Sequence, residues 1–289
     1  MQRKAPTELA GERNRNVVIQ AVGAPTPGVP VANVLGVGVH AVSVPRAIEL
    51  LNSSIERGQK GYVCVTGVHG IMEAHRDLQF RRALEAAMLV VPDGMPAVWI
   101  GRSQGYRQMS RVFGPDLMLE FCRQSISRGY RHFFYGGNPG VAKQLAVAMG
   151  EKAPGLNIVG AESPPFRPLN QAEKSELQRR LQEVSPDVIW VGLSTPKQEQ
   201  FMAANIADLN CRVMVGVGAA FDFHTGKIKD SPQWVKDAGL QWLHRLCQDP
   251  SRLWKRYLVN NSAFVAKLAM QTVGIRNYDS KNSKPSCAN

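Results

Sequence analysis

Several charged residues stand directly after short apolar runs, where acid–base or phosphate chemistry could take place. Asp93 follows Met88–Val91 in the motif PDG, and a carboxylate at a strand end is well placed to act as a general base. The same aspartate could cap a following helix, which is the commoner use of such a residue. In the segment RVFGPD, Asp116 could likewise cap a helix, while Arg111 could hold a diphosphate. The residues themselves leave these alternatives open.

Glycine-rich segments follow other apolar runs and could approach a phosphate group. Gly136, Gly137 and Asn138 lie between the run RHFFY and a predicted helix, and glycine lets the amides at a helix start face an anion. A tight turn that simply requires glycine explains the same residues equally well. Gly218 and Asp222 belong to one more such segment, GVGAAFD.

The segment STPKQE follows the run Asp187–Gly192 and begins another predicted helix. A proline in the first turn and an early glutamate, Glu199, suit a helix N-terminus. Lys197 and Gln198 are not explained in that way, and we expect their side chains to face a cleft. Four such strand ends in one chain indicate a ligand site better than any one of them alone.

Cysteine, histidine, aspartate and glycine can bind metals or nicotinamide cofactors, but in this sequence their spacing suits neither role. The cysteines are scattered without a CxxC pair, which is typical of reduced thiols in the cytosol: Cys64, Cys122, Cys211, Cys247 and Cys287. The sequence contains no Asp-x-Asp pair, and His69, His75 and His224 lack metal-ligand spacing. Gly36 and Gly38 do not extend into a dinucleotide fingerprint. We therefore predict neither a metal nor a cofactor.

The elements that must position these residues alternate between strand and helix. Predicted strands cover Val34–Val39, Gly61–Thr66, Met88–Val91, Arg131–Tyr135, Leu156–Gly160, Asp187–Gly192 and Arg212–Gly216. Helices are predicted between them, among them Val44–Arg57, Leu117–Ser127, Val141–Gly150 and Gln171–Val184. This order predicts an α/β fold with a doubly wound, mostly parallel, Rossmann-like sheet. Ligands bind at the carboxyl ends of the strands of such sheets, where the residues above are found.

Composition and charge divide the 289 residues into three parts. Hydrophobic residues make up 44% of the chain, enough for a full core, which argues against a disordered, collagen-like or disulfide-stapled protein. Residues 1–30 are polar and then rich in proline and glycine, and we predict a flexible extension there, followed by a catalytic domain over 31–239. Residues 240–289 form a predicted basic appendage of two amphipathic helices broken near Asp249 and Pro250.

The net charge of +12 predicts anionic partners. The uncharged stretch Asn16–Pro45 carries four prolines and cannot be one spanning helix, and the polar start of the chain does not read as a signal peptide. We therefore expect no integral membrane segment, although the chain could lie on a membrane surface.

Taken in order, the motifs PDGMP, GPD, GGNPGVA and PKQE and the Trp/Arg-rich tail resemble the WecG/TagA/CpsF family of bacterial glycosyltransferases. The resemblance covers roughly Val34 to Phe264. It implies an inverting, metal-independent enzyme of cell-surface polysaccharide biosynthesis. Such an enzyme moves a sugar from a UDP-sugar to a polyprenyl-diphosphate-linked saccharide. The sugar would be of the N-acetylmannosamine, N-acetylmannosaminuronate, glucose or glucuronate type.

The resemblance also implies roles for particular residues. The proposed base of the family falls on Asp93, and Thr66 and Gln198 match residues implicated near the donor or the acceptor. Many members carry Thr-x-Asn after the second strand, whereas this chain reads Thr66, Gly67, Val68, His69 and lacks the asparagine. That departure leaves the donor and acceptor sugars open, but not the class of reaction. His69 could fill part of the missing role.

A metal-independent transfer needs cations and backbone amides around the leaving UDP. From the tail we select Arg245, Arg252 and Arg256 as diphosphate contacts, although ordinary solvated charge explains them equally well. The other substrate-binding residues that we predict are Gly94, Arg111, Gly114, Asp116, Gly136, Gly137, Asn138, Lys197, Glu199, Gly218 and Asp222.

The basic tail also predicts a place for the enzyme in the cell. Its cations would meet the anionic inner leaflet, with Trp242, Trp254 and Tyr257 at the interface. We therefore expect a cytoplasmic protein, peripheral on the inner face of the plasma membrane. The alternatives are an NAD-dependent enzyme that modifies nucleotide sugars and a basic nucleic-acid-binding protein. We expect no nucleic-acid partner, and a homo-oligomer is compatible with the sequence.

Overall fold

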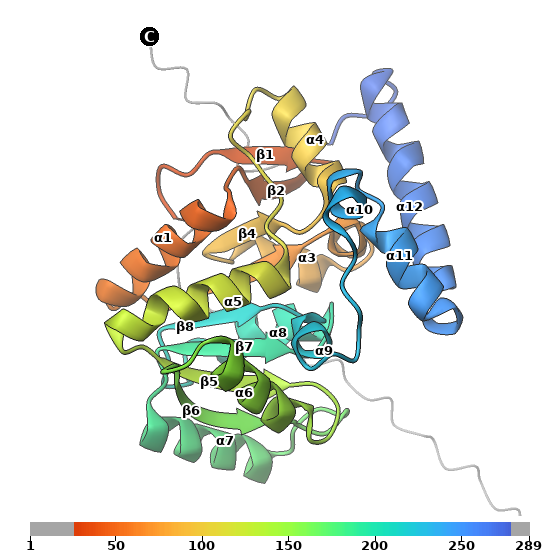
Figure 1. Cartoon of the computed structure of the whole chain (residues 1–289). Coiled ribbons are helices and arrows are strands. Elements are labelled where there is room, and N and C mark those ends of the chain that lie inside the picture. The colour runs from red at the N-terminus through yellow and green to blue at the C-terminus, as the bar shows by residue number, and fades with distance from the viewer. Residues whose placement is uncertain (1–25, 279–289) are drawn as a thin grey trace, which may run out of the picture.

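A computed structural model describes residues 26–278, and their core is a parallel sheet in the order β4-β3-β8-β7-β5-β6 (Figure 1). All neighbouring strands run in the same direction. The strands are β3 (Gly61–Thr66), β4 (Leu89–Pro92), β5 (Arg131–Gly136), β6 (Asn157–Glu162), β7 (Val188–Gly192) and β8 (Val213–Gly216). The predicted doubly wound α/β fold is confirmed.

Helices cover both faces of this sheet, as the unbroken apolar runs of the strands require. On one face pack α1 (Val44–Glu56), α5 (Gly114–Ser125) and α6 (Val141–Lys152). On the other pack α2 (Val68–Ala74), α3 (Leu78–Glu85), α7 (Gln171–Val184) and α8 (Lys197–Asn205). Successive strand side chains divide between the two cores, so that Tyr62 faces one and Val63 the other.

The first predicted strand, Val34–Val39, is wrong, because this segment forms a hairpin outside the parallel sheet. Its strands β1 (Val31–Val34) and β2 (Val37–His40) pair antiparallel. Leu35 and Gly36 form the turn with φ of 53° and 81°, a conformation that glycine adopts readily. The apolar alternation continues through the turn, which hides it from a periodicity argument.

Two helices begin differently from the predicted pattern. The N-cap of α4 (Met95–Ser103) is Gly94, so Asp93 lies one residue before the cap and does not cap the helix. Helix α5 begins at Gly114 and not at Leu117, because Pro115 suits the first turn of a helix. Asp116 therefore lies inside the first turn and does not cap α5 either.

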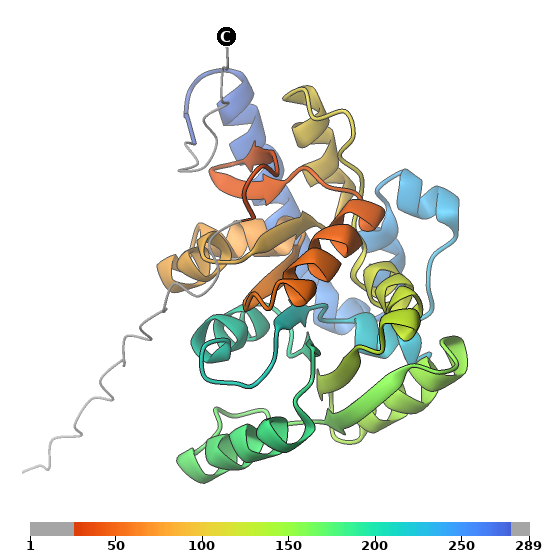
Figure 2. The ribbon, with the colours of Figure 1, turned by 90° about the vertical axis from the view of Figure 1, so that its left-hand side faces the viewer.

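The C-terminal part is helical, with the break near Asp249 that the sequence predicts. It contains α10 (Gln233–Asp237), α11 (Gln241–Gln248) and α12 (Pro250–Thr272), preceded by the short α9 (Ala220–His224), while η1 (Ile126–Arg128) follows α5. Helix α12 packs against α2 and α11. The end of this segment reaches the hairpin, where Asn33 Nδ2 donates to the Tyr278 carbonyl at 2.6 Å (Figure 2).

Two predictions concern the ends of the chain and its relation to a membrane. Residues 1–25 of the predicted extension and residues 279–289 of the predicted appendage lie outside the described residues. Within residues 26–278, no helix has the length and apolar character needed to cross a membrane. The division into parts at residues 239 and 240 remains a prediction.

Candidate active site

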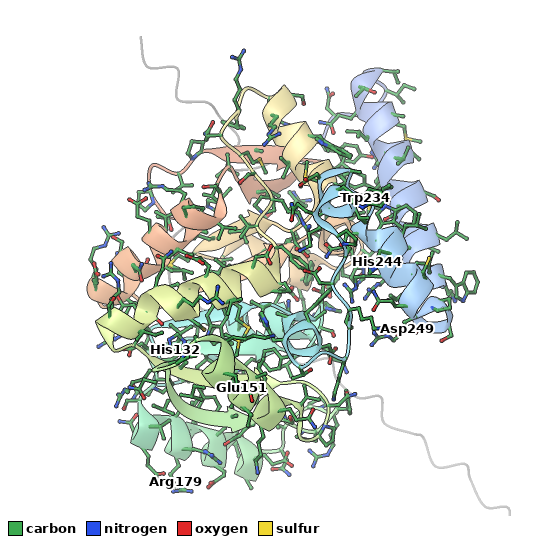
Figure 3. All side chains as sticks on the ribbon, viewed as in Figure 1. His132, Glu151, Arg179, Trp234, His244 and Asp249 are labelled. Atoms are coloured by element: carbon green, nitrogen blue, oxygen red, sulfur yellow. The ribbon has the colours of Figure 1, made fainter. Side chains whose placement is uncertain are left out.

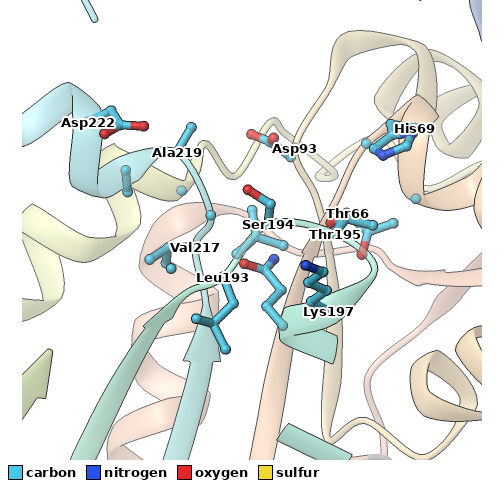
Figure 4. Close-up of a pocket in the computed structure, with 18 of the residues that line it drawn as sticks. Thr66, His69, Asp93, Leu193, Ser194, Thr195, Lys197, Val217, Ala219 and Asp222 are labelled. Atoms are coloured by element: carbon cyan, nitrogen blue, oxygen red, sulfur yellow. The ribbon is translucent and has the colours of Figure 1, made fainter. Parts of the chain in front are cut away.

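A cavity of about 1020 Å³ lies at the carboxyl edge of the sheet, and residues of helices α10 to α12 complete its wall. Figure 4 shows the part of the wall formed at the strand ends. The wall includes segments that follow every strand of the parallel sheet, the place where α/β sheets bind ligands. The predicted site residues in this wall are Thr66, Asp93, Gly94, Arg111, Gly114, Gly137, Asn138, Lys197, Gln198, Gly218, Asp222, Arg245, Arg252 and Arg256. Gly136, Asp116 and Glu199 are not part of this wall: Gly136 and Glu199 are buried elsewhere, and Asp116 is exposed.

Asp93 stands in the cavity wall directly after β4, between Asp222 on one side and His69 on the other (Figure 4). Its backbone N–H donates to the Thr66 carbonyl at 3.0 Å, which ties the loop to β3. Among the described residues, its buried Oδ1 has no hydrogen-bond partner. The carboxylate therefore has an oxygen available to receive a proton.

The electrostatic surroundings of Asp93 act in opposite directions. Burial raises its pKa from the ordinary value of 3.8 to about 6, because an ionised carboxylate loses hydration there. Arg111, Arg245 and the backbone amide of Gly114 lower the pKa, and the nearby Asp116 raises it. Asp93 is thus mostly ionised at neutral pH but basic enough to accept a proton, the balance that general-base catalysis favours.

Thr66 and Gln198 belong to the same cavity wall as Asp93. Gln198 Nε2 donates to Glu199 Oε1 at 3.0 Å, and Thr195 Oγ1 donates to the same oxygen at 2.9 Å. Both Gln198 Oε1 and Thr66 Oγ1 are buried with no partner in the part of the chain that the structure describes. The amide nitrogen of Gln198 is therefore occupied, and its oxygen remains free to accept a hydrogen bond.

Glu199 accepts the hydrogen bonds of Gln198 and Thr195 and is not part of the cavity wall. Its side chain is fully buried, and burial raises its pKa above the ordinary value, while Gln198 and Thr195 lower it by hydrogen bonding. Gly216 leaves the room that Gln198 needs, because a Cβ there would lie 3.2 Å from Gln198 Nε2.

Several cationic side chains line the cavity. Arg111 lies 4.2 Å from the centre of the Phe113 ring and also contacts Gln241. Arg245 lies over the Phe223 ring at 5.6 Å. The Nε of Arg256 is buried and, within residues 26–278, unpaired. These guanidinium groups can hold a diphosphate with charge-assisted hydrogen bonds.

The other two predicted cations are more exposed. Arg252 is paired with Asp249 at 2.6 Å, so part of its charge is already neutralised. Lys197 is exposed and donates to the Phe166 carbonyl at 3.3 Å, which fastens it to the loop that follows β6.

The glycine-rich loop after β5 serves two purposes. A Cβ on Gly136 would lie 2.5 Å from the Gly192 carbonyl oxygen, so this glycine is required by the close approach of β7. Gly137, with φ of 72°, and Asn138 reach the cavity wall. Within this one motif, Gly136 therefore serves the close approach of the strands, and Gly137 and Asn138 serve the ligand site.

Comparison with known proteins decides the family. The sequence model described as the glycosyl transferase WecG/TagA/CpsF family matches residues 32–278, from the hairpin to the end of the described chain. The chain belongs to the WecG/TagA/CpsF family. The resemblance inferred from the motifs is confirmed, and the protein is a glycosyltransferase.

Two relatives of this WecG/TagA/CpsF glycosyltransferase carry the same name, N-acetylglucosaminyldiphosphoundecaprenol N-acetyl-beta-D-mannosaminyltransferase. The protein from Bacillus subtilis (strain 168) is 27% identical over 185 residues, which is 64% of this chain and 70% of the relative. The protein from Bacillus spizizenii (strain ATCC 23059 / NRRL B-14472 / W23) is 28% identical over 200 residues, 69% of this chain and 76% of the relative.

Sequence reasoning missed several cavity residues of this WecG/TagA/CpsF enzyme. Lys236, Gln241 and Asn260 come from α10, α11 and α12, and the loop 164–169 follows β6. A search next to sheet strands passes over Lys236, Gln241 and Asn260, because the C-terminal helices that carry them do not follow a strand directly. Within residues 26–278, no three His, Cys, Asp or Glu side chains group closely enough to hold a metal ion.

Proposed function

We propose that this enzyme transfers a hexosyl group, of the N-acetylmannosamine type, from a UDP-sugar to a saccharide carried on a polyprenyl diphosphate. The names of the two relatives specify N-acetylmannosamine transfer to N-acetylglucosaminyl-diphosphoundecaprenol, and these names support the choice of sugar and acceptor. The product would serve the biosynthesis of a cell-surface polysaccharide. The reaction would invert the configuration at the anomeric carbon, because a single displacement at that carbon, assisted by a single base, is sufficient for the transfer.

The observation that carries this proposal is the Asp93 carboxylate, with its raised pKa, in a cavity surrounded by arginines. The acceptor hydroxyl oxygen would form a bond to the anomeric carbon while its proton moves to Asp93. The bond between that carbon and the diphosphate oxygen would break, and its electron pair would leave with UDP. The free oxygens of Thr66 and Gln198 would hold sugar groups that donate hydrogen bonds.

Arg111, Arg245 and Arg256 would stabilise the negative charge that develops on UDP. Three guanidinium groups in a partly enclosed cavity supply the positive charge that other transferases take from a divalent ion. We therefore propose a metal-independent transfer.

Exposed tryptophans on the helices that border the cavity would hold the enzyme on the membrane. Trp99 of α4, Trp234 of α10, Trp242 of α11 and Trp254 of α12 are exposed, and Figure 3 labels Trp234 on this side of the molecule. A Cβ on Gly239 would lie 2.9 Å from Trp99, so α4 adjoins the helical segment. We propose that these tryptophans, together with nearby cations, meet the anionic inner leaflet on the cytoplasmic side.

A transfer assay with defined substrates tests the proposal. The full chain is incubated with UDP-N-acetylmannosamine, a synthetic N-acetylglucosaminyl-diphosphoprenol and anionic vesicles, and the product is separated by chromatography. A disaccharide lipid with inverted anomeric configuration is expected, with equal yield in EDTA. Parallel reactions with UDP-glucose and UDP-glucuronate test the other donors. Failure of every donor, or release of a modified nucleotide sugar that depends on NAD, would refute the proposal.

A further inference from the structure

One face of α12 turns toward the body of the protein and carries a buried amide. Leu253, Arg256, Asn260 and Phe264 recur at helical spacing along this face. Asn260 is only 4% exposed, between Leu253 and Phe264, which are 2% and 3% exposed. A carboxamide in such surroundings needs hydrogen-bond partners for both its nitrogen and its oxygen.

The nitrogen of Asn260 has a partner in the loop after β3. Asn260 Nδ2 lies 3.0 Å from His69 Nδ1. Burial, with the charge of Arg256, lowers the pKa of His69 to about 4, so its ring is neutral and has one donor and one acceptor nitrogen. The backbone of Thr195 raises the pKa of His69, and the nitrogen of the Asn260 carboxamide can only donate. Nδ1 therefore accepts from the Asn260 nitrogen, which fixes the orientation of the amide.

This orientation leaves the oxygen of Asn260 unsatisfied. Oδ1 is buried and has no partner among residues 26–278, although Asn260, His69 and Thr195 all belong to the cavity wall. Thr66 Oγ1 and Gln198 Oε1 in the same wall are unsatisfied in the same way. Three buried polar oxygens in one cavity match a ligand that brings hydroxyl or amide donors.

We propose that Asn260 is a substrate-binding residue whose Oδ1 accepts a hydrogen bond from a hydroxyl or amide N–H group of a bound sugar, and that His69 positions it. The inference rests on the proposed function, because it assumes that the cavity binds a sugar. A carbonyl oxygen repels a diphosphate, which is held instead by cations such as Arg256, one turn away on α12.

Binding measurements on Asn260→Ala separate the sugar from the nucleotide. Calorimetry with UDP and with UDP-N-acetylmannosamine is compared for the wild type, Asn260→Ala and the control Gln271→Ala, which removes an amide from α12 outside the cavity wall. If Asn260 contacts the donor sugar, the variant binds UDP-N-acetylmannosamine about tenfold more weakly and UDP unchanged, as for one lost hydrogen bond. If it contacts the acceptor sugar, donor binding is unchanged and the KM for the acceptor rises about tenfold.

Two results would overturn the assignment. The first is that Asn260→Ala changes neither donor binding nor the acceptor KM. The second is an equal loss of UDP and UDP-sugar binding, which would mean that α12 has moved. A wild-type protein that neither binds nor transfers any sugar would refute the proposed function and this inference with it.

The part played by His69 is tested by a double-mutant cycle. His69→Ala is expected to weaken the same step as Asn260→Ala, and the double variant to be no worse than Asn260→Ala alone. Additive losses would show that His69 does not act through Asn260.

Discussion

Replacing Asp93 with asparagine should lower the activity and raise the stability of the protein. The burial that raises the pKa of Asp93 also makes the ionised carboxylate unfavourable in the folded state. The change keeps the size of the side chain and removes the proton acceptor. A general base contributes about 10²- to 10⁴-fold to a rate, so kcat should fall by that factor in Asp93→Asn. With a pKa of about 6, wild-type activity should fall roughly tenfold between pH 7 and pH 5, and this acid limb should vanish in the variant.

Although Asp93→Asn should lower the activity, it should raise the stability of the fold at pH 7. The rise of the Asp93 pKa from 3.8 to about 6 corresponds to roughly 3 kcal/mol, at about 1.4 kcal/mol for each pKa unit. Because the folded pKa is raised, this contribution favours the folded state fully below pH 3.8 and is lost as the pH rises through 6. At pH 7 the ionised carboxylate therefore destabilises the fold, and Asp93→Asn should stabilise it by up to roughly 3 kcal/mol.

Both effects are measured on the same preparations. Transfer is followed from pH 5 to pH 8, and the free energy of unfolding is measured in urea at pH 7. UDP binding should persist in Asp93→Asn, and Asp208→Asn, which removes an exposed carboxylate outside the cavity, should resemble the wild type. Wild-type turnover in Asp93→Asn would remove Asp93 as the base, and lower stability at pH 7 would refute the account of its burial.

Four further predictions concern the cations, the membrane surface, the metal requirement and the buried histidines. Arg256→Ala should weaken UDP binding about 10- to 100-fold in calorimetry, whereas Arg179→Ala on α7 should have no effect; equal affinities would remove Arg256 from the diphosphate site. The double variant Trp242→Ala/Trp254→Ala should bind phosphatidylglycerol vesicles at least about tenfold more weakly in flotation assays, and unchanged binding would exclude that surface. EDTA should leave the transfer rate unchanged, and restoration of a lost rate by Mg²⁺ would contradict the proposed mechanism. Burial lowers the pKa of His132 to about 4, so the contribution of His132 to the free energy of unfolding falls as the pH drops from 6.5 toward 4, by about 2 kcal/mol between pH 7 and pH 5. The free energy of unfolding is measured in urea titrations at both pH values. A smaller loss of stability in His132→Gln than in the wild type would support this explanation, and equal losses in the two proteins would contradict it.

Much of the fold follows from local patterns in the sequence. The six sheet strands were predicted within a few residues, and the helix Gln171–Val184 has the predicted bounds, because Asn170 and Glu173 form a capping box at its start. The hairpin was missed because β1 and β2 continue one apolar alternation. Only the positive φ of Leu35 and Gly36 separates the two strands.

The candidate site was predicted less completely, for a different reason. Residues next to strand ends, such as Asp93 and Gln198, were found because a parallel sheet brings its carboxyl ends to one edge. Glu199 was predicted to bind substrate, but it is not part of the cavity wall. Helix periodicity does not tell which of two adjacent polar residues, Gln198 or Glu199, reaches a cavity. Asn260 gave no signal, because its role depends on a partner 191 residues away in the chain.

Local patterns in the sequence are sufficient to predict the α/β class, the edge of the sheet where ligands should bind, the glycosyltransferase family and the positive charge of the C-terminal part. These properties depend on periodicity, turn chemistry and motifs, which act over short stretches of chain. The protonation balance of Asp93 and the orientation of Asn260 against His69 arise only when the chain is folded. Both depend on burial and on contacts between distant segments, because hydration, charge and hydrogen-bond geometry at a buried atom are set by whichever residues the packing brings there.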